Sequence, residues 1–133
     1  MIVVDTNVIG YLYLTSERSS QAEVALLKDS GWVAPLLWRS EFRNVLALYI
    51  RKSILSLDDA LRIMEEASTL MQGNEYDVAS LQVMQLVAES TCSAYDCEFV
   101  ALAKDLNLHL VTVDKRILEQ FPNVAISLGE FVS

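Results

Sequence analysis

The sequence has very few of the side chains that many enzymes use as bases and nucleophiles. It contains one histidine, His109, and two cysteines, Cys92 and Cys97, among 133 residues. A single histidine rules out nuclease mechanisms that need two, and it supports no convincing Ser-His-Asp or Cys-His arrangement. Two cysteines without a further Cys or His pair do not complete a zinc site. Both thiols are therefore predicted to be reduced, small residues of the core.

Long hydrophobic runs are also missing. Although 53% of the residues are hydrophobic, the longest uninterrupted apolar runs, 45–50 and 99–103, are far shorter than the ~20 residues that span a bilayer. No basic leader precedes an apolar segment, so the sequence predicts a cytoplasmic protein without a membrane segment. Its length fits a single domain over residues 1–133. The surplus of apolar residues indicates a buried partner surface, most simply that of a homodimer.

Basic residues are scarce. Ten Lys and Arg stand against 18 Asp and Glu, which gives a net charge of −8. Taken alone, this charge argues against a nucleic-acid-binding protein. If four of the acids held two divalent cations, however, the sum would move from −8 to −4. Positive charges also lie near two of the acids: Lys115 and Arg116 follow Asp114, and Arg43 lies close to Glu41. These three cations are the candidate contacts for an anionic substrate.

Short apolar runs alternate along the chain with stretches that favour helices. The predicted strands are 2–4, 32–34, 109–113 and 124–126, with a short extended segment at 75–78. The predicted helices are 7–14, 20–29, 35–53, 57–72, 79–89, 94–106 and 115–121. In detail, Ser20 and Glu23 are predicted to form a capping box, Gly31 to end a helix and Gly129 to begin the tail. The alternation predicts an α/β fold whose mostly parallel sheet is covered by helices on both faces.

Four acidic residues occupy unusual positions in this pattern. Asp5 and Asp114 each follow a predicted strand, where an open α/β sheet gathers its ligands. Glu41 lies within the apolar stripe of its helix, and Asp96 lies in the first turn of the next-to-last predicted helix, above an apolar stripe. Each acid alone is also explained as a helix cap or a surface charge. Together they predict a shared pocket at one end of the sheet.

Four carboxylates in one pocket cannot all remain ionised unaided, because like charges raise each other's pKa. Bound cations relieve this repulsion. Oxygen ligands without His or Cys favour Mg²⁺ or Mn²⁺ over zinc. Two such ions about 4 Å apart activate a water molecule and stabilise the leaving oxygen of a phosphodiester, so that no histidine base is required.

Four segments carry a resemblance to a known family: Val4–Asn7, Trp38–Glu41, Ser93–Ala103 and Val111–Asp114. In order and spacing they resemble the PIN-domain ribonucleases, and most closely the toxin subunits of VapBC-type toxin–antitoxin pairs. The resemblance implies a PIN-like three-layer α/β/α fold with four or five strands, Mg²⁺- or Mn²⁺-dependent cleavage of RNA, homodimers and a cognate antitoxin that fills the cleft. The positions that match the family's metal-binding acids are Asp5, Glu41, Asp96 and Asp114. Thr112 matches the hydroxyl that supports the metal or its water, and Asn7 matches the polar residue that orients the first acid.

Three other interpretations stay open at this point. The first is a PIN-type RNA-processing nuclease without an antitoxin. The second is a Mg²⁺-binding signalling module of the receiver type, which needs an acidic pair after the first strand, a phosphoacceptor Asp after a middle strand and a late Lys. Here Asp5 stands alone, and the strand at 32–34 ends in Pro35. The third is a binding module without catalytic activity.

Overall fold

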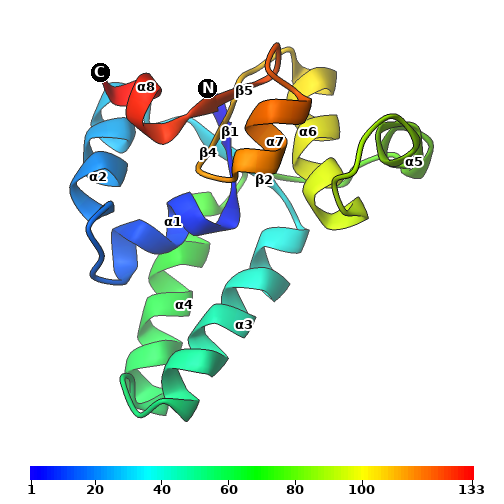
Figure 1. Ribbon diagram of the computed structural model, residues 1–133. Coiled ribbons are helices and arrows are strands. Elements are labelled where there is room, and N and C mark those ends of the chain that lie inside the picture. Colours follow the sequence, from blue (N-terminus) through cyan, green and yellow to red (C-terminus); the bar gives the residue numbers. More distant parts are fainter.

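The protein is described here by a computed structural model of residues 1–133, in which five short strands form one sheet (Figure 1). The strands are β1 Ile2–Val4, β2 Trp32–Pro35, β3 Glu75–Tyr76, β4 Leu110–Thr112 and β5 Ala125–Ser127. They pair in the order β3-β2-β1-β4-β5, and every pairing is parallel. The predicted α/β fold with a parallel sheet of four or five strands is therefore confirmed.

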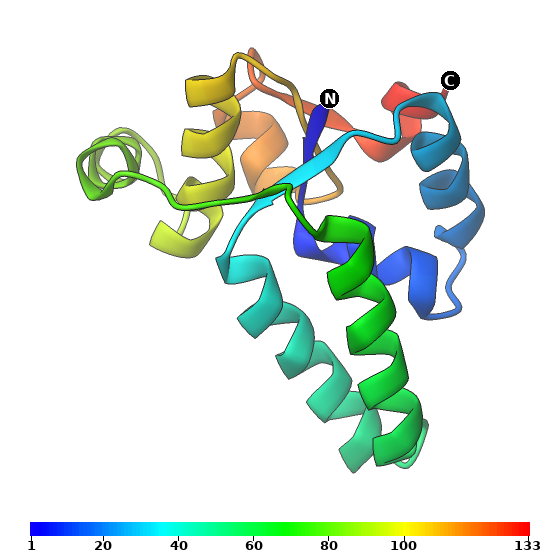
Figure 2. The same cartoon turned by 180° about the vertical axis from the view of Figure 1, so that it is seen from behind.

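Eight helices connect and cover the strands. They are α1 Thr6–Tyr13, α2 Ser19–Lys28, α3 Leu37–Arg51, α4 Leu57–Met71, α5 Ser80–Glu89, α6 Ala94–Leu106, α7 Lys115–Gln120 and α8 Leu128–Val132. Figures 1 and 2 show α6 on one side of the sheet, with α5 outside it, and α1, α2 and α8 on the other side. The helices α3 and α4 form a hairpin that projects beyond the sheet. No helix is long and apolar enough to cross a membrane.

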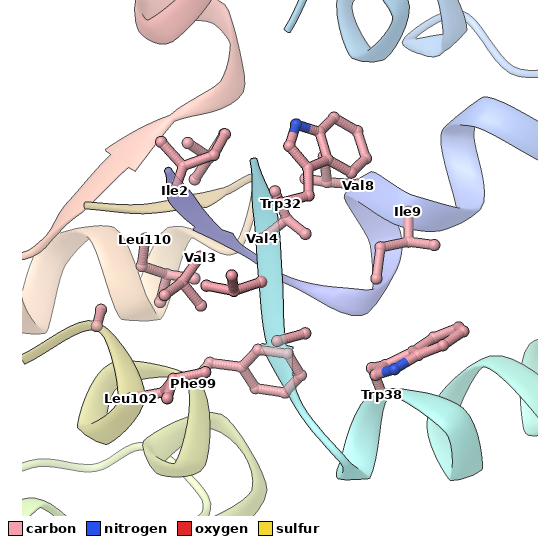
Figure 3. Close-up of a cluster of buried hydrophobic side chains, with 14 of the residues drawn as sticks. Ile2, Val3, Val4, Val8, Ile9, Trp32, Trp38, Phe99, Leu102 and Leu110 are labelled. Carbon is pink, nitrogen blue, oxygen red and sulfur yellow. The ribbon is translucent and has the colours of Figure 1, made fainter. Parts of the chain in front are cut away.

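The central strand β1 is buried on both faces, as its three consecutive apolar residues predict. Val3 pairs with Val33 of β2 on one side and with Leu110 of β4 on the other. Figure 3 shows Phe99 of α6 on one side of these strands and Val8 of α1 on the other. Since helices cover both faces, neither face tolerates a polar side chain within the strand. Polar residues can enter only where the strand ends, and Asp5 does so.

The order of the strands on the two sides of β1 explains why a crevice forms at the carboxyl end of this strand. From β1 the chain proceeds to β2 and β3 at one edge, whereas β4 and β5 lie on the other side of β1. The connections leaving β1 and β4 therefore diverge and open a crevice at the carboxyl ends of these two strands. Asp5 follows β1 directly and Asp114 lies two residues after the end of β4, so both lie at this crevice.

Several predicted element ends are wrong by a few residues, for identifiable reasons. The hydroxyl of Ser19 closes the preceding turn by accepting from the Ser16 amide and donating to the Leu14 carbonyl. Helix α2 consequently begins at Ser19, and Arg18 precedes it without any side-chain cap, so the predicted capping box at Ser20 is not formed. Pro35 ends β2 rather than beginning α3, because a proline is tolerated at a strand end where its nitrogen need not donate.

Two glycine predictions also fail. Helix α2 ends at Lys28 with Asp29 as its C-cap, and Gly31 lies beyond that end without a positive φ. Gly31 is instead approached closely by Met1, since a Cβ on Gly31 would lie 2.9 Å from the Met1 side chain. Gly129 does not begin a tail, because it lies inside α8, whose first turn is capped by the Ser127 hydroxyl accepting from the Glu130 amide at 3.1 Å. The Ser-x-x-Glu spacing at 127–130 is the signal that sequence reasoning missed.

The edge strand β3 is tied to the start of α3 through Glu75. Its carboxylate accepts from the Trp38 indole at 2.8 Å and from the Arg39 guanidinium at 2.7 Å. These contacts hold the pKa of Glu75 below its ordinary value of 4.5, with the Arg39 hydrogen bond as the largest cause. A lowered carboxyl pKa stabilises the fold above pH 4.5 and loses that contribution as the pH falls through the folded-state pKa.

We therefore expect Glu75→Gln to lower the free energy of unfolding by roughly 1–2 kcal/mol near neutral pH, because it removes a charge-assisted pair. The difference from the wild type should shrink as the pH falls below the ordinary carboxyl range. Urea unfolding over a pH series measures both quantities. A difference that stays constant from neutral to acidic pH would show that the Glu75 charge does not contribute.

Candidate functional site

A cavity of about 260 Å³ opens at the carboxyl ends of β1 and β4. It is lined by Asp5, Thr6, Asn7, Glu41, Asn44, Val45, Asp96, Phe99, Asp114 and Ile117. All four acids singled out from the sequence are in this lining, although they are separated by up to 109 residues, from Asp5 to Asp114. Asp5 and Asp114 arrive there as the N-caps of α1 and α7, Glu41 from a face of α3 and Asp96 from the first turn of α6.

Asp5 is the most buried of the four acids, with 8% of its surface exposed. One carboxylate oxygen accepts from the Val8 amide at 3.0 Å and so caps α1. The other oxygen accepts from the Thr112 hydroxyl. Burial raises the pKa of Asp5 to about 6, and the hydrogen bonds from Thr112 and Val8 offset only part of this effect. A bound cation would favour the ionised form of this buried carboxylate.

Asp114 lines the cavity beyond the end of β4, and Thr112, the last residue of β4, supports it without lining the cavity itself. The Thr112 side chain is fully buried, and its oxygen accepts from the Asp114 amide at 3.0 Å while its hydroxyl donates to Asp5. Asp114 caps α7 by accepting from the Ile117 amide at 3.1 Å. Thr112 therefore fixes the ends of β1 and β4 relative to each other.

Glu41 lies on the inner face of α3, about half buried, and is held by a residue that sequence reasoning missed. The Thr6 hydroxyl donates to Glu41 at 2.7 Å and joins the start of α1 to α3. Burial raises the pKa of Glu41, the nearby charge of Asp96 raises it further, and the Thr6 hydrogen bond lowers it. The signal for Thr6 in the sequence is only its position next to Asp5, because its partner is 35 residues away.

Asp96 enters the cavity from the first turn of α6. Its amide donates to the Ser93 hydroxyl at 3.1 Å, so Ser93 caps the helix as predicted. Burial and then the charge of Asp114 raise the pKa of Asp96. Glu98, two residues further along, is absent from the cavity lining, although the charge of Glu41 contributes to its raised pKa. The charges of neighbouring carboxylates therefore contribute to the raised pKa values of Glu41, Asp96 and Glu98.

Asn7 lines the cavity, but it forms no hydrogen bond with Asp5, whose partners are Val8 and Thr112. Asn7 is exposed to solvent, and the structure shows no contact by which it would orient the buried acid. Asn44 of α3 is likewise exposed and in the lining, and the sequence alone did not single it out.

The donor set of the cavity consists entirely of oxygen, from carboxylates, hydroxyls and amides. No three acidic, Cys or His side chains converge closely enough to form a finished coordination cluster. Two of the acids, Asp5 and Asp114, each use one oxygen to cap a helix, which leaves the second oxygen of Asp114 free for another partner. Hard divalent cations such as Mg²⁺ suit this chemistry, since they bind a few carboxylates and retain several waters.

Comparisons with known proteins agree with this geometry. The sequence matches the PIN domain over residues 2–125. It is 30% identical over 124 residues to Ribonuclease VapC3 of Pyrobaculum aerophilum, a match covering 91% of this chain and 95% of the relative. Among solved structures, PAE2754 of Pyrobaculum aerophilum is similar with a TM-score of 0.78 and 18% identity, covering 98% of this chain and 92% of the other.

Two further structures share the fold. FitAcB of Neisseria gonorrhoeae has a TM-score of 0.75 at 19% identity, with 97% of this chain and 99% of the other covered. A toxin–antitoxin complex of Klebsiella pneumoniae has a TM-score of 0.70 at 17% identity, with 96% and 98% covered. With the family match spanning nearly the whole chain and the four acids gathered at the end of its parallel sheet, this protein belongs to the PIN-domain family.

Proposed function

We propose that this protein is a metal-dependent endoribonuclease that hydrolyses RNA phosphodiester bonds and acts as the toxin of a type II toxin–antitoxin pair. The observation that carries the proposal is the cavity that Asp5, Glu41, Asp96 and Asp114 share. The relative named Ribonuclease VapC3 supports the reaction. The alternative is an RNA-processing nuclease of the same family that has no antitoxin.

The cavity suits Mg²⁺ or Mn²⁺ as the cofactor, because burial and then neighbouring carboxylates raise the pKa values of Asp5, Glu41 and Asp96, and a bound cation would offset both effects. These three acids and Asp114 would hold the metal. A bound divalent ion would supply Lewis-acid activation of water and charge stabilisation at the phosphate. The hydroxyls of Thr112 and Thr6 orient Asp5 and Glu41 by direct hydrogen bonds.

The supporting contacts matter because a carboxylate free to rotate binds an ion less well. Thr112 holds Asp5 in one rotamer, and the Asp5 carboxylate in turn caps α1. Asn7 offers an exposed amide to the substrate or to ordered water. On the outer side of the acids, Lys115 and Arg116 are exposed at the start of α7 and are placed to contact phosphates.

Metal dependence tests the proposal directly. We expect cleavage of single-stranded RNA with Mg²⁺ or Mn²⁺ and none after EDTA, with activity restored when the ion is added back. Because an ion that binds only the folded state stabilises it, Mn²⁺ should also raise the melting temperature. Cleavage that persists in EDTA, in a preparation free of contaminating nuclease, would contradict the proposal.

A further prediction concerns the hydrogen bond between Thr6 and Glu41. Thr6→Val removes the donor while keeping the shape of the side chain, so Glu41 loses its orienting partner. Loss of such a supporting contact costs roughly 10- to 100-fold in metal affinity or activity. RNA cleavage measured over a Mn²⁺ titration gives the change, and Thr6→Ser is the control because it keeps the hydroxyl. Equal loss in Thr6→Ser and Thr6→Val would show that the hydroxyl is not responsible.

For partners, we propose a cognate antitoxin and a second copy of this chain. Solved structures of the same fold include a toxin–antitoxin complex from Klebsiella pneumoniae and FitAB bound to an IR36 DNA fragment. Next to the acidic cavity lies a more apolar pocket lined in part by Tyr11, Leu14 and Tyr49, which suits a segment of an antitoxin.

Exposed apolar residues such as Leu81 and Met84 of α5 support a homodimer. Sedimentation equilibrium would test the dimer, and a mass of one chain would exclude it.

A further inference from the structure

The exposed face of α3 is basic in a protein that is otherwise acidic. Its exposed residues are Ser40, Arg43, Asn44, Leu48 and Arg51, none of which is acidic. The single acid of α3 is Glu41, which is turned into the cavity and bonded to Thr6. Lys52, also exposed, follows the helix directly. The outer face of α3 therefore presents positive charge without compensating carboxylates.

The partner helix of the hairpin has the opposite charge. The exposed acids of α4 are Asp58, Asp59, Glu65 and Glu66. Its one cation, Arg62, is paired with Asp59 at 3.3 Å. By contrast, neither Arg43 nor Arg51 forms an ion pair, and Arg43 donates only to the Ser40 hydroxyl. The hairpin thus separates charge, with free cations on α3 and acids on α4.

The basic face of α3 is continuous with the catalytic cavity. Asn44 is both exposed and part of the cavity lining, and Arg43 is its neighbour. Arg51 lies seven residues beyond Asn44, which is close to two helical turns and roughly 10 Å along the axis, on the same side of the helix. We name Arg43, Asn44, Arg51 and Lys52 the α3 strip. It leads from the mouth of the cavity to the end of the projecting hairpin (Figure 1).

We propose that the α3 strip binds the phosphates of a single RNA strand that leads out of the cavity, an inference that rests on the proposed ribonuclease function. Arginine suits this task because its planar guanidinium binds phosphate through two parallel hydrogen bonds. Proteins that hold single strands commonly track the backbone with positive charge. The acids of α4 repel the same strand and so keep it on α3.

The test is RNA binding as a function of salt, with Asp96→Asn in every protein so that the RNA is not cut. The probe is a fluorescent single-stranded RNA of mixed sequence, about 20 nucleotides long, long enough to cover the cavity and the strip. The test variant is Arg43→Gln with Arg51→Gln. The matched control, Arg62→Gln with Lys104→Gln, removes the same charge from exposed positions on α4 and α6.

Each phosphate contact on a single strand contributes ~0.7 to the slope of log affinity against log salt. We expect the Arg43/Arg51 variant to bind about tenfold more weakly at low salt, with a slope shallower by roughly 1.4, and the Arg62/Lys104 control to match the reference protein. Equal affinity and slope in the two double variants overturn the inference. The α3 strip would then be a surface that binds an acidic protein partner. A weaker affinity with an unchanged slope overturns it as well.

The outcome for the α3 strip is separable from the outcome for the proposed function. If the wild-type protein fails to cleave RNA with Mg²⁺ or Mn²⁺ yet binds it through Arg43 and Arg51, the ribonuclease proposal fails and the binding strip stands. If the wild-type protein cleaves RNA and the double variant binds normally, the strip fails alone. If the wild-type protein does not bind RNA, both fail.

Discussion

Asp96→Asn is expected to reduce RNA cleavage by roughly 10³-fold, a loss comparable to removing a key electrostatic group from an active site. The substitution keeps the size of the side chain and removes the charge that, in the proposed site, holds the metal. Asp96 is only partly buried, so the fold should remain intact. Initial rates of cleavage of a labelled RNA at saturating Mn²⁺ measure the effect, and growth inhibition on expression should disappear with it.

The matched control is Asp105→Asn, which removes one negative charge from an exposed position on the same helix. It should cleave RNA like the wild type, because Asp105 does not line the cavity. Without divalent ions the Asp96→Asn protein should be at least as stable as the wild type, since the cavity then holds one carboxylate fewer. Cleavage by Asp96→Asn within a few-fold of the wild type would show that this acid has no part in the reaction.

The expected stability of Asp96→Asn without divalent ions follows from the raised pKa values of the acids in the cavity. Asp5, Glu41 and Asp96 all have raised pKa values, with burial as the largest cause in each case. The charged forms of these acids therefore favour unfolding, and a cation bound in the proposed site would reverse their effect. In the proposed site, function and stability would therefore oppose each other, as is common at active sites.

The strand-end acids were predictable from local sequence. An apolar run followed by an acid predicts a carboxylate at the carboxyl edge of a parallel sheet, and this rule finds Asp5 and Asp114. The helical spacing of apolar residues finds Glu41 because a carboxylate on the buried side of a helix is unusual. These signals need only a few neighbouring residues, so a single sequence reveals them.

The supporting residues were harder to predict because their partners are distant in sequence. Thr6 gains its role only when α3 is packed beside α1, and Asn44 only when the cavity opens beside it. The sheet order, with β1 between β2 and β4, was also not fixed by periodicity. Local sequence patterns predict whether a segment is a strand or a helix, whereas these features depend on how the segments pack against one another.

Phe42 is the packed side chain on which the α1–α3 contact depends. It is fully buried, with its ring 6.1 Å from the ring of Trp38 and 6.5 Å from that of Tyr13, measured between centroids. It also lies beside Gly10 of α1. Directly before it in the chain, Glu41 forms its hydrogen bond to Thr6 across the same two helices. The core and the candidate active site therefore share one helix interface.

Phe42→Ala is expected to lower the free energy of unfolding by about 3–5 kcal/mol, through lost burial and the cavity left behind. That is a large part of the roughly 5–15 kcal/mol that stabilises a typical domain. Because α3 is no longer held against α1, the Thr6–Glu41 bond should loosen, and the Mn²⁺ concentration needed for half-maximal cleavage should rise even where the protein is folded.

Urea unfolding and a Mn²⁺ titration of cleavage measure the two effects, with Phe42→Leu as the control that keeps most of the buried volume. A loss below about 1 kcal/mol in Phe42→Ala would mean that α1 and α3 are held together by other contacts and that Glu41 is positioned without this packing.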